Sequence, residues 1–309
     1  MVDSLKMIIN NMDYSVIKCS STWKNVEKLN KGWSKDRKYI VTDINNNKFL
    51  LRLSDISLYE KKKEQFELLK KVEALDINAS RPVEFGVFND TSIYMVLTYL
   101  EGEDAEQIMQ DKTNDEAYNL GIQAGKALYK LHQIPVSQGN QTWYDRFKEK
   151  IEVKVKKLNE CPYKLNNSDI LVDYIYKNMN ILKGRSKSFT HGDYHLGNMI
   201  VNENGIGIID FDKNGATDLI DDFKPFCWNI RKSEYFETGL VNGYFNNNIP
   251  DNFWHLIKLY TAEHLISHLP WASTFGEKEI KTAYEIYELV MNSYDNFNLL
   301  IPKWYKGVL

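Results

Sequence analysis

Three side chains between Phe189 and Asp212 have the types and spacing for phosphoryl-transfer chemistry. The segment reads FTHGDYHLGNMIVNENGIGIIDFD, with Asp193 and Asn198 five positions apart and Asp210 near its end. Phosphoryl transfer needs a carboxylate that accepts the proton of the acceptor hydroxyl, and divalent cations on the phosphates. Asp193 is the candidate base. Asn198 and Asp210 can supply the oxygen ligands that a hard cation such as Mg2+ prefers.

The local sequence can bring these groups together. Gly192 and Gly197 relax the steric limits of the loop that carries the first two. Apolar runs at 199–202 and 206–209 flank a polar turn at 203–205, which predicts a hairpin. The hairpin returns the last aspartate to the neighbourhood of the first, so the mechanism is coherent from the residues alone.

Residues 1–100 have the pattern of a small strand-rich lobe with one helix. Strands are expected at 38–42, 48–53, 83–88 and 93–99. A helix is expected from Ser57, because Ser57 and Glu60 have the spacing of a capping box. We therefore expect an N-terminal domain at 1–100 and a second domain at 101–309.

Residues 101–309 are largely helical in pattern. Thr113 and Glu116 have the spacing of a second capping box, and further helices are expected at 144–159 and 169–182. Helices rich in aromatic residues follow from Leu219. The tryptophans of this part are expected in the core more than on a ligand platform: Trp228, Trp254, Trp271 and Trp304.

Composition favours a small-molecule partner. The 309 residues include 39 basic and 42 acidic ones, so the net charge of −3 gives no electrostatic reason to bind nucleic acid or an anionic membrane. The three cysteines are far apart in sequence, and the first twenty residues lack an apolar signal segment. We expect a cytoplasmic protein; the sequence leaves its oligomeric state open.

The stretch HGDYHLGN followed by IDFD resembles the catalytic and metal-binding motifs of the aminoglycoside phosphotransferase family, small-molecule relatives of the protein kinases. The resemblance implies an α+β, protein-kinase-like bilobal fold, with an N-terminal antiparallel sheet and one helix before a mostly helical C-terminal lobe. It implies Asp193 as catalytic base, Asn198 and Asp210 as Mg2+ ligands, and ATP or GTP as phosphate donor.

The resemblance also implies nucleotide contacts in the first 100 residues. Arg52 departs from the family pattern, which has lysine there; its alternative reading is a surface charge on an edge strand. Glu64 corresponds to the acidic partner of that lysine. The implied cofactor-binding residues are Ser34 in the phosphate-covering loop, Leu50 over the purine, Arg52, Glu64, and Thr98, Tyr99 and Leu100 in the hinge.

The sequence leaves the identity of the phosphate acceptor open. No long activation segment follows Asp210, which favours a small molecule over a protein. Acidic side chains favour a polycationic aminoglycoside, whereas aromatic ones favour a sugar, a macrolide or a quaternary amine such as choline. The candidate acceptor residues are Asp222, Glu234, Trp228, Glu263 and Trp271; Asp218 or Asp222 is alternatively a brace of the catalytic loop or a helix cap. Homoserine is a further candidate acceptor, and antibiotic resistance and a housekeeping role are equally compatible with the sequence.

Two other readings use the same residues. The alternation of His191, Asp193 and His195 also occurs in dinuclear metal hydrolases, which need further histidines. His264 and His268 lie four apart on an expected helix but lack the glutamate of His-Glu-x-x-His. A kinase-like protein that binds nucleotide without turnover is the second alternative.

Overall fold

The computed structural model describes residues 8–9, 12–30 and 36–308. Contacts divide the chain into an N-terminal unit, Met1–Gly102 with Gly207–Ile209, and a C-terminal unit, Glu103–Ile206 with Asp210–Leu309. Each has its own core. Among the described residues, none of the helices is both long and apolar enough to cross a bilayer.

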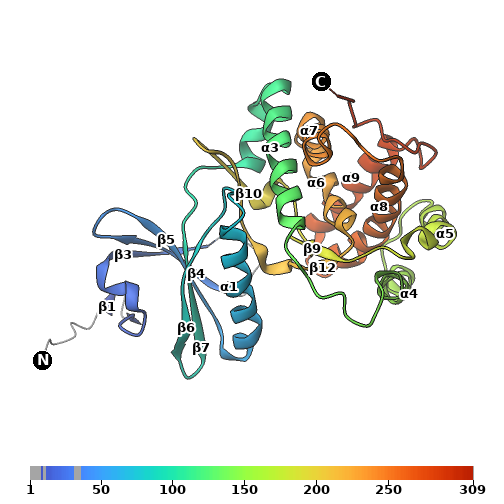
Figure 1. The fold of residues 1–309 in the computed structure, drawn as a ribbon. Helices are drawn as coiled ribbons and strands as arrows, with labels where there is room; N and C mark the ends of the chain where they lie inside the picture. Colours follow the sequence, from blue (N-terminus) through green and yellow to red (C-terminus); the bar gives the residue numbers. More distant parts are fainter. Residues whose placement is uncertain (1–7, 10–11, 31–35, 309) are drawn as a thin grey trace, which may run out of the picture. The chain divides into compact units, whose positions relative to one another are not determined.

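An antiparallel five-stranded sheet in the order β3-β4-β5-β7-β6 forms the N-terminal unit, and helix α1 lies along it (Figure 1). The unit contains β1 (Ile8–Ile9), β2 (Met12–Asp13), β3 (Trp23–Leu29), β4 (Arg37–Asp43), β5 (Lys48–Asp55), α1 (Tyr59–Glu73), β6 (Pro82–Asn89) and β7 (Ser92–Thr98). The four strands predicted from the sequence are confirmed.

The side chains of strand β5 alternate between the two faces of this sheet. Leu51 and Leu53 belong to the buried cluster that also contains Trp23. Because side chains alternate along a strand, Leu50 and Arg52 point to the opposite face. Every second residue of β5 therefore serves the core, and the remaining ones are available for polar contacts.

Helix α1 begins one residue later than the capping pattern predicted, because the observed N-cap is Leu58 and not Ser57. The carboxylate of Asp55 accepts hydrogen bonds from the backbone N–H and the hydroxyl of Ser57, at 2.9 and 2.6 Å. This turns Ile56–Leu58 into a 3-10 helix, and α1 starts at Tyr59 without a side-chain cap. The Ser57–Glu60 capping box is thus wrong, because Asp55 binds Ser57 first.

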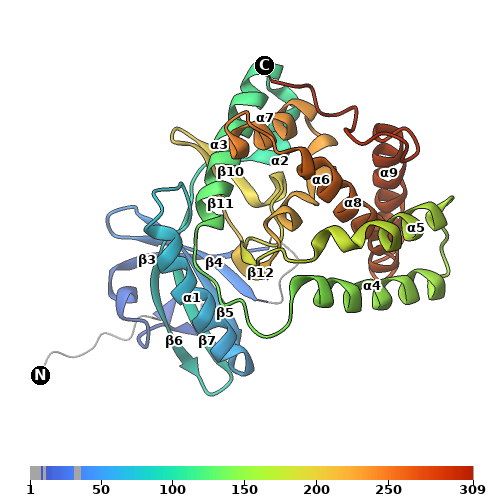
Figure 2. The same ribbon diagram turned by 45° about the vertical axis from the view of Figure 1, so that its right-hand side comes forward.

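The C-terminal unit is mainly helical. It contains β8 (Glu103–Asp104), α2 (Ala105–Ile108), α3 (Asn114–His132), α4 (Trp143–Glu160), α5 (Ser168–Asn178), β9 (Ser188–Thr190), β10 (Met199–Asn202), β12 (Gly215–Thr217), α6 (Phe226–Ile230), α7 (Glu234–Phe245), α8 (Asp251–Ala272) and α9 (Glu277–Ser293), while β11 (Gly205–Ile208) crosses between units. The predicted capping box of Thr113 and Glu116 is present at the start of α3. Helix α8 packs against α4, α5 and α9, whose labels lie around it in Figure 2.

Helices α3 and α7 lie side by side with their backbones in contact (Figure 1). Glycines four apart on each helix make this possible: Gly121 and Gly125 face Gly239 and Gly243. A Cβ at Gly125 would lie 2.1 Å from the carbonyl oxygen of Leu240, closer than real contacts allow. The glycines thus fix α7 against α3.

Candidate active site

The loop that carries Asp193 and Asn198 lies in the C-terminal unit, directly after a short strand. Strand β9 pairs antiparallel with β12, and the loop from His191 to Asn198 follows β9. Gly192 has φ +83°, and a Cβ there would lie 2.1 Å from the carbonyl oxygen of Lys213. Only glycine satisfies both conditions. The loop is thereby held against the segment that follows Asp210.

Asp222 braces the first half of this loop. Its two carboxylate oxygens accept hydrogen bonds from the backbone N–H groups of His191 and Gly192, each at 2.6 Å. The Nε2 atom of His132 lies 3.1 Å from the same carboxylate. With the residue only 1% exposed, the proposed acceptor contact of Asp222 is not supported; the predicted alternative, a brace of the catalytic loop, fits the geometry.

Asn229 and Glu237 support the second half of the loop. The Asn229 amide oxygen accepts a hydrogen bond from the backbone N–H of Leu196 at 2.8 Å, and its amide nitrogen donates to Glu237 Oε2 at 2.7 Å. Burial raises the pKa of Glu237 to about 8, against a smaller opposing effect of Asn229. Sequence reasoning missed this support, because Glu237 resembled any other acidic residue of a surface helix.

Asp193 faces solvent and is surrounded by donors. The amide nitrogen of Asn198 lies 3.0 Å from its Oδ2 atom, and the Lys213 Nζ atom lies 2.9 Å from the same oxygen. His195 Nε2 lies 3.7 Å away. Burial alone raises the pKa of Asp193, but His195 and Lys213 more than offset it and hold the pKa well below its usual range. The carboxylate is therefore ionised at neutral pH, as a proton acceptor must be. Lys213 was not singled out from the sequence.

The structure gives Asn198 and Asp210 features expected of ligands for a hard cation. Asn198 turns its amide nitrogen toward Asp193, which leaves its amide oxygen available as a ligand atom. Asp210 has left-handed backbone angles, φ 62° and ψ 68°, which Asp tolerates better than most residues. Its buried Oδ1 atom has no hydrogen-bond partner among the described residues. An orphaned carboxylate oxygen is what a bound cation would satisfy.

An aromatic contact connects the loop that carries Asp193 with the segment that follows Asp210. The rings of His191 and Phe211 lie 4.8 Å apart between centroids, and His191 is fully buried. His191 thus packs against rings, while His195 Nδ1 accepts a hydrogen bond from the backbone N–H of Gly197 at 3.1 Å. The two histidines do not converge, and within the described part of the chain no group of three or more His, Cys, Asp or Glu side chains could hold a metal. The dinuclear hydrolase reading therefore lacks its ligand set.

In the N-terminal unit, Arg52 is a buried residue of a central strand, so its reading as a surface charge on an edge strand is wrong. Its Nε and Nη2 atoms lie 3.0 and 2.5 Å from Asp36 Oδ2. Lys62 Nζ lies 2.9 Å from the same oxygen, and the Ser54 hydroxyl donates to Oδ1 at 2.8 Å. Burial raises the pKa of Asp36, but Arg52 and Lys62 bring it below its usual value.

Asp36 therefore takes the position that the resemblance assigned to Glu64. Glu64 is exposed, whereas Lys62 and Gln65 point inward from α1. The reason is helical geometry: the buried residues of α1 recur every three or four positions from Lys62 through Phe66 to Val72, and Glu64 lies off that face. The partner sixteen positions before Arg52 was not apparent from sequence.

The hinge candidates retain few unused backbone donors. The Thr98 N–H donates to the carbonyl of Arg81 at 2.9 Å, and the Tyr99 N–H donates to the carbonyl of Lys48 at 3.0 Å. The N–H groups of Thr98 and Tyr99 are therefore already engaged within the N-terminal unit. Leu50 is half-buried on the same sheet face as Arg52. Ser34 lies outside the described residues.

Two further acceptor candidates are already bound by lysines. Glu263 is fully buried and contacts Lys154 and, at 3.1 Å, Lys150, with Lys224 at 3.9 Å. Burial raises its pKa, but the three ammonium groups lower it well below its usual range. Glu234 forms an ion pair with Lys306 at 2.5 Å. Neither carboxylate is free for a cationic acceptor.

The two tryptophan candidates belong to an aromatic group beside the base. Trp228 lies 6.1 Å from His195 between ring centroids. Trp271 packs on His268 at 5.8 Å and is largely exposed. The expectation that the tryptophans are core residues holds for Trp254 and Trp304, which are buried, but not for Trp271.

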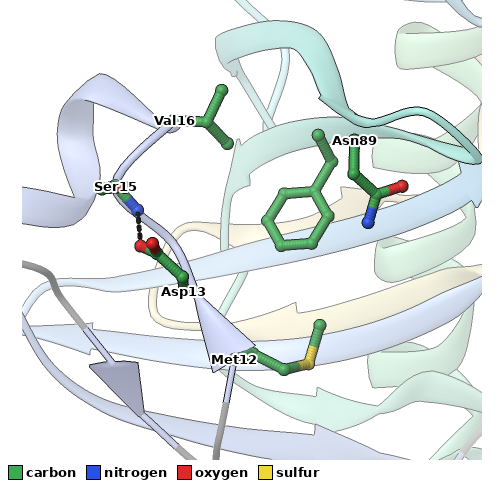
Figure 3. Close-up of a pocket in the computed structure, with 6 residues that line it drawn as sticks. Met12, Asp13, Ser15, Val16 and Asn89 are labelled. Carbon is green, nitrogen blue, oxygen red and sulfur yellow. Dashed lines mark hydrogen bonds between the residues drawn. The ribbon is translucent and has the colours of Figure 1, made fainter.

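A separate pocket in the N-terminal unit contains none of these groups. Its volume is about 400 Å3, and Met12, Asp13, Ser15, Val16, Phe88 and Asn89 line it. Figure 3 shows Asp13 turned back to the N–H of Ser15, a hydrogen bond of 2.9 Å. This pocket contains none of the residues considered above for phosphoryl transfer.

Comparisons with known proteins agree with this geometry. The sequence model described as "Phosphotransferase enzyme family" matches residues 25–251. No curated protein sequence matches the chain significantly.

Several solved structures of small-molecule kinases share the fold. The GDP complex of wild-type aminoglycoside 2'-phosphotransferase-IIIa is 19% identical, with 90% of this chain and 94% of that chain covered and a TM-score of 0.66. Amicoumacin kinase hAmiN, in complex with AMP-PNP, Ca2+ and Ami, is 15% identical, with 98% of both chains covered and a TM-score of 0.63. A fructosamine-3-kinase described as putative, from Haemophilus somnus 129PT, is 15% identical, with 86% and 91% covered and a TM-score of 0.61.

The family match extends over most of the chain, and these structures share its protein-kinase-like fold. The chain therefore belongs to the phosphotransferase enzyme family and is a small-molecule kinase that phosphorylates a hydroxyl group.

Proposed function

We propose that the chain transfers the γ-phosphoryl group of ATP or GTP to a hydroxyl of a small compound, with Asp193 as base. The observation that carries this proposal is the ionised Asp193 carboxylate, held by Asn198 and Lys213 beside the segment of Asp210. The acceptor oxygen forms a bond to the γ-phosphorus, and the bond to the β–γ bridging oxygen breaks. The acceptor proton passes to Asp193.

Asn198 and Asp210 are the proposed Mg2+ ligands. Support comes from the amide oxygen left over by Asn198 and from the orphaned Oδ1 atom of Asp210. A bound Mg2+ neutralises phosphate charge. The chain orients Asn198 through its hydrogen bonds to Asp193, and the packing of Phe211 on His191 holds the residue next to Asp210 in place.

Arg52 and Lys62 are the proposed anchors of the nucleotide phosphates. Arg52 and Lys62 both contact the Asp36 carboxylate, which places two cationic groups side by side in the N-terminal unit. Arginine remains charged and can bind phosphate with two N–H groups, which makes it suited to replace lysine here. Ser34, Leu50 and the hinge residues 98–100 complete the proposed nucleotide site, and Glu64 is not part of it.

The test is an ADP-release screen with ATP or GTP and Mg2+ across hydroxylated compounds. We expect turnover with at least one acceptor class, and no release above background in Asp193→Ala although the nucleotide still binds. Nucleotide binding without acceptor-dependent release in the wild type would favour a non-catalytic nucleotide-binding protein. Unchanged turnover in Asp193→Ala would overturn the assignment of the base.

A further inference from the structure

A continuous series of rings extends from the catalytic base, and we call it the aromatic row. It consists of His195, Trp228, His268, Trp271 and Phe275. Adjacent centroids lie 6.1 Å (His195 and Trp228), 5.5 Å (Trp228 and His268), 5.8 Å (His268 and Trp271) and 4.7 Å (Trp271 and Phe275) apart. The first member lies 3.7 Å from the Asp193 carboxylate.

The far end of the row presents aromatic surface to solvent. Trp271 is 45% exposed and Phe275 is 46% exposed, although aromatic side chains usually bury most of their area. Both belong to the last turn of α8 and the segment after it. Contiguous exposed rings of this kind mark ligand sites more often than isolated apolar residues do.

The middle of the row contains a histidine with unused hydrogen-bonding capacity. His268 is 7% exposed, and neither of its ring nitrogens has a hydrogen-bond partner in the part of the chain that the structure describes. Burial, and to a smaller extent the charge of Arg231, lower the pKa of His268 to about 4. The neutral ring offers one donor and one acceptor, which is what a ligand hydroxyl can satisfy.

The charges around the row disfavour a cationic ligand. The guanidinium of Arg231 lies 5.7 Å from the ring centre of Trp228. Glu263 lies five residues before His268 on α8, and three lysines neutralise its charge. Asp218 is likewise bound by Arg185. Arg231 is itself paired with Glu285 at 3.2 Å, so the charges beside the row are balanced and offer a polycation no excess of negative charge.

We propose that the aromatic row is the acceptor subsite, and that the acceptor is an uncharged polyhydroxylated ring, such as a sugar or a glycoside. The apolar face of the ring stacks on Trp228 and Trp271, and one of its hydroxyls binds one ring nitrogen of His268. Another hydroxyl reaches Asp193. The assignment rests on the proposed phosphoryl transfer, because the row leads to an acceptor hydroxyl only if Asp193, which His195 contacts, is the base.

Binding is the test, measured by quenching of tryptophan fluorescence and by calorimetry with methyl glycosides, a macrolide glycoside, gentamicin and choline as probes. We expect a glycoside to bind and the two cationic probes not to bind. Trp271→Ala should weaken glycoside binding at least tenfold, and Trp271→Phe should restore most of it. Tyr176→Ala, which removes a similarly exposed ring from α5, is the matched control.

His268→Leu separates recognition from a structural role. A residue that merely supports the fold would destabilise the chain when replaced. Removing a buried unpaired imidazole should instead raise the melting temperature while it weakens glycoside binding at least tenfold. Lower stability with unchanged glycoside affinity would overturn the assignment.

The same probes distinguish this inference from the proposed reaction. In Asp193→Ala, a glycoside should still bind although phosphoryl transfer is lost. If a glycoside binds the wild type but is never phosphorylated, the reaction fails and the subsite stands. If gentamicin or choline binds better than every glycoside, or if none of the glycosides binds, the subsite fails whatever the turnover.

Discussion

Glu237 makes stability fall as pH rises, with a magnitude that follows from its burial. The side chain is 1% exposed, and burial raises its pKa from an ordinary value of 4.5 to about 8. Between about pH 4.5 and about pH 8 the unfolded chain releases this proton while the folded chain keeps it. Folding therefore loses at most about 1.4 kcal/mol per pH unit, and about 5 kcal/mol over the whole window.

The substitution Glu237→Gln removes this dependence and retains an acceptor for the Asn229 amide. We expect the variant to be more stable than the wild type at pH 7 by up to about 3 kcal/mol, with the difference vanishing near pH 4.5. Urea denaturation at pH 5.5, 6.5 and 7.5, followed by fluorescence, measures the difference. Glu234→Gln on the same helix, where the carboxylate is exposed, is the control.

A difference between Glu237→Gln and the wild type that does not change with pH would refute the reasoning. It would mean that the buried carboxyl does not retain its proton. Because Gln still holds Asn229 in place, phosphoryl transfer should survive in this variant. Asn229→Leu should reduce kcat instead, since the Leu196 N–H loses its acceptor.

Other perturbations test separate parts of the site. Asp222→Asn leaves one of the two backbone N–H groups without an acceptor, so we expect a loss of about 1–3 kcal/mol in urea denaturation and a lower kcat; an unchanged kcat would contradict the brace. Lys213→Met should raise the pKa of Asp193, because it removes one of the charges that lower it, and carboxyl-carbon NMR titration measures that pKa; an unchanged pKa would count against the pairing. Arg52→Met should raise the KM for nucleotide at least tenfold while Arg52→Lys retains most affinity; equal KM values would exclude it as a phosphate anchor. Gly125→Ala should destabilise the chain by about 1–3 kcal/mol or more, because its Cβ meets backbone atoms of α7; wild-type stability would show that the helices separate easily.

The strands and the main helices followed from local patterns because their causes are local. Alternation along β5 and the Thr113 capping box need only neighbouring residues. The predicted start of α1 was wrong for a reason that is also local. Asp55 accepts the hydrogen bond from Ser57, and a rule based on the spacing of Ser57 and Glu60 does not consider that competing contact.

The motif residues were identifiable because their chemistry requires particular side chains at fixed spacing. The residues that hold the motif residues in place were not identifiable, because they come from distant parts of the chain. Asp36 reaches Arg52 across sixteen positions, and Asp222 reaches His191 across thirty-one. The sequence also does not distinguish a carboxylate such as Glu263, buried among lysines, from one that lines a substrate site.

Single-turnover phosphoryl transfer in Asp193→Asn, at saturating nucleotide and with the acceptor found in the screen, tests the central claim most directly. We expect the rate to fall by about 10²–10⁴-fold, because a neutral amide cannot accept the acceptor proton, while nucleotide affinity is retained. A transfer rate equal to that of the wild type would contradict the account.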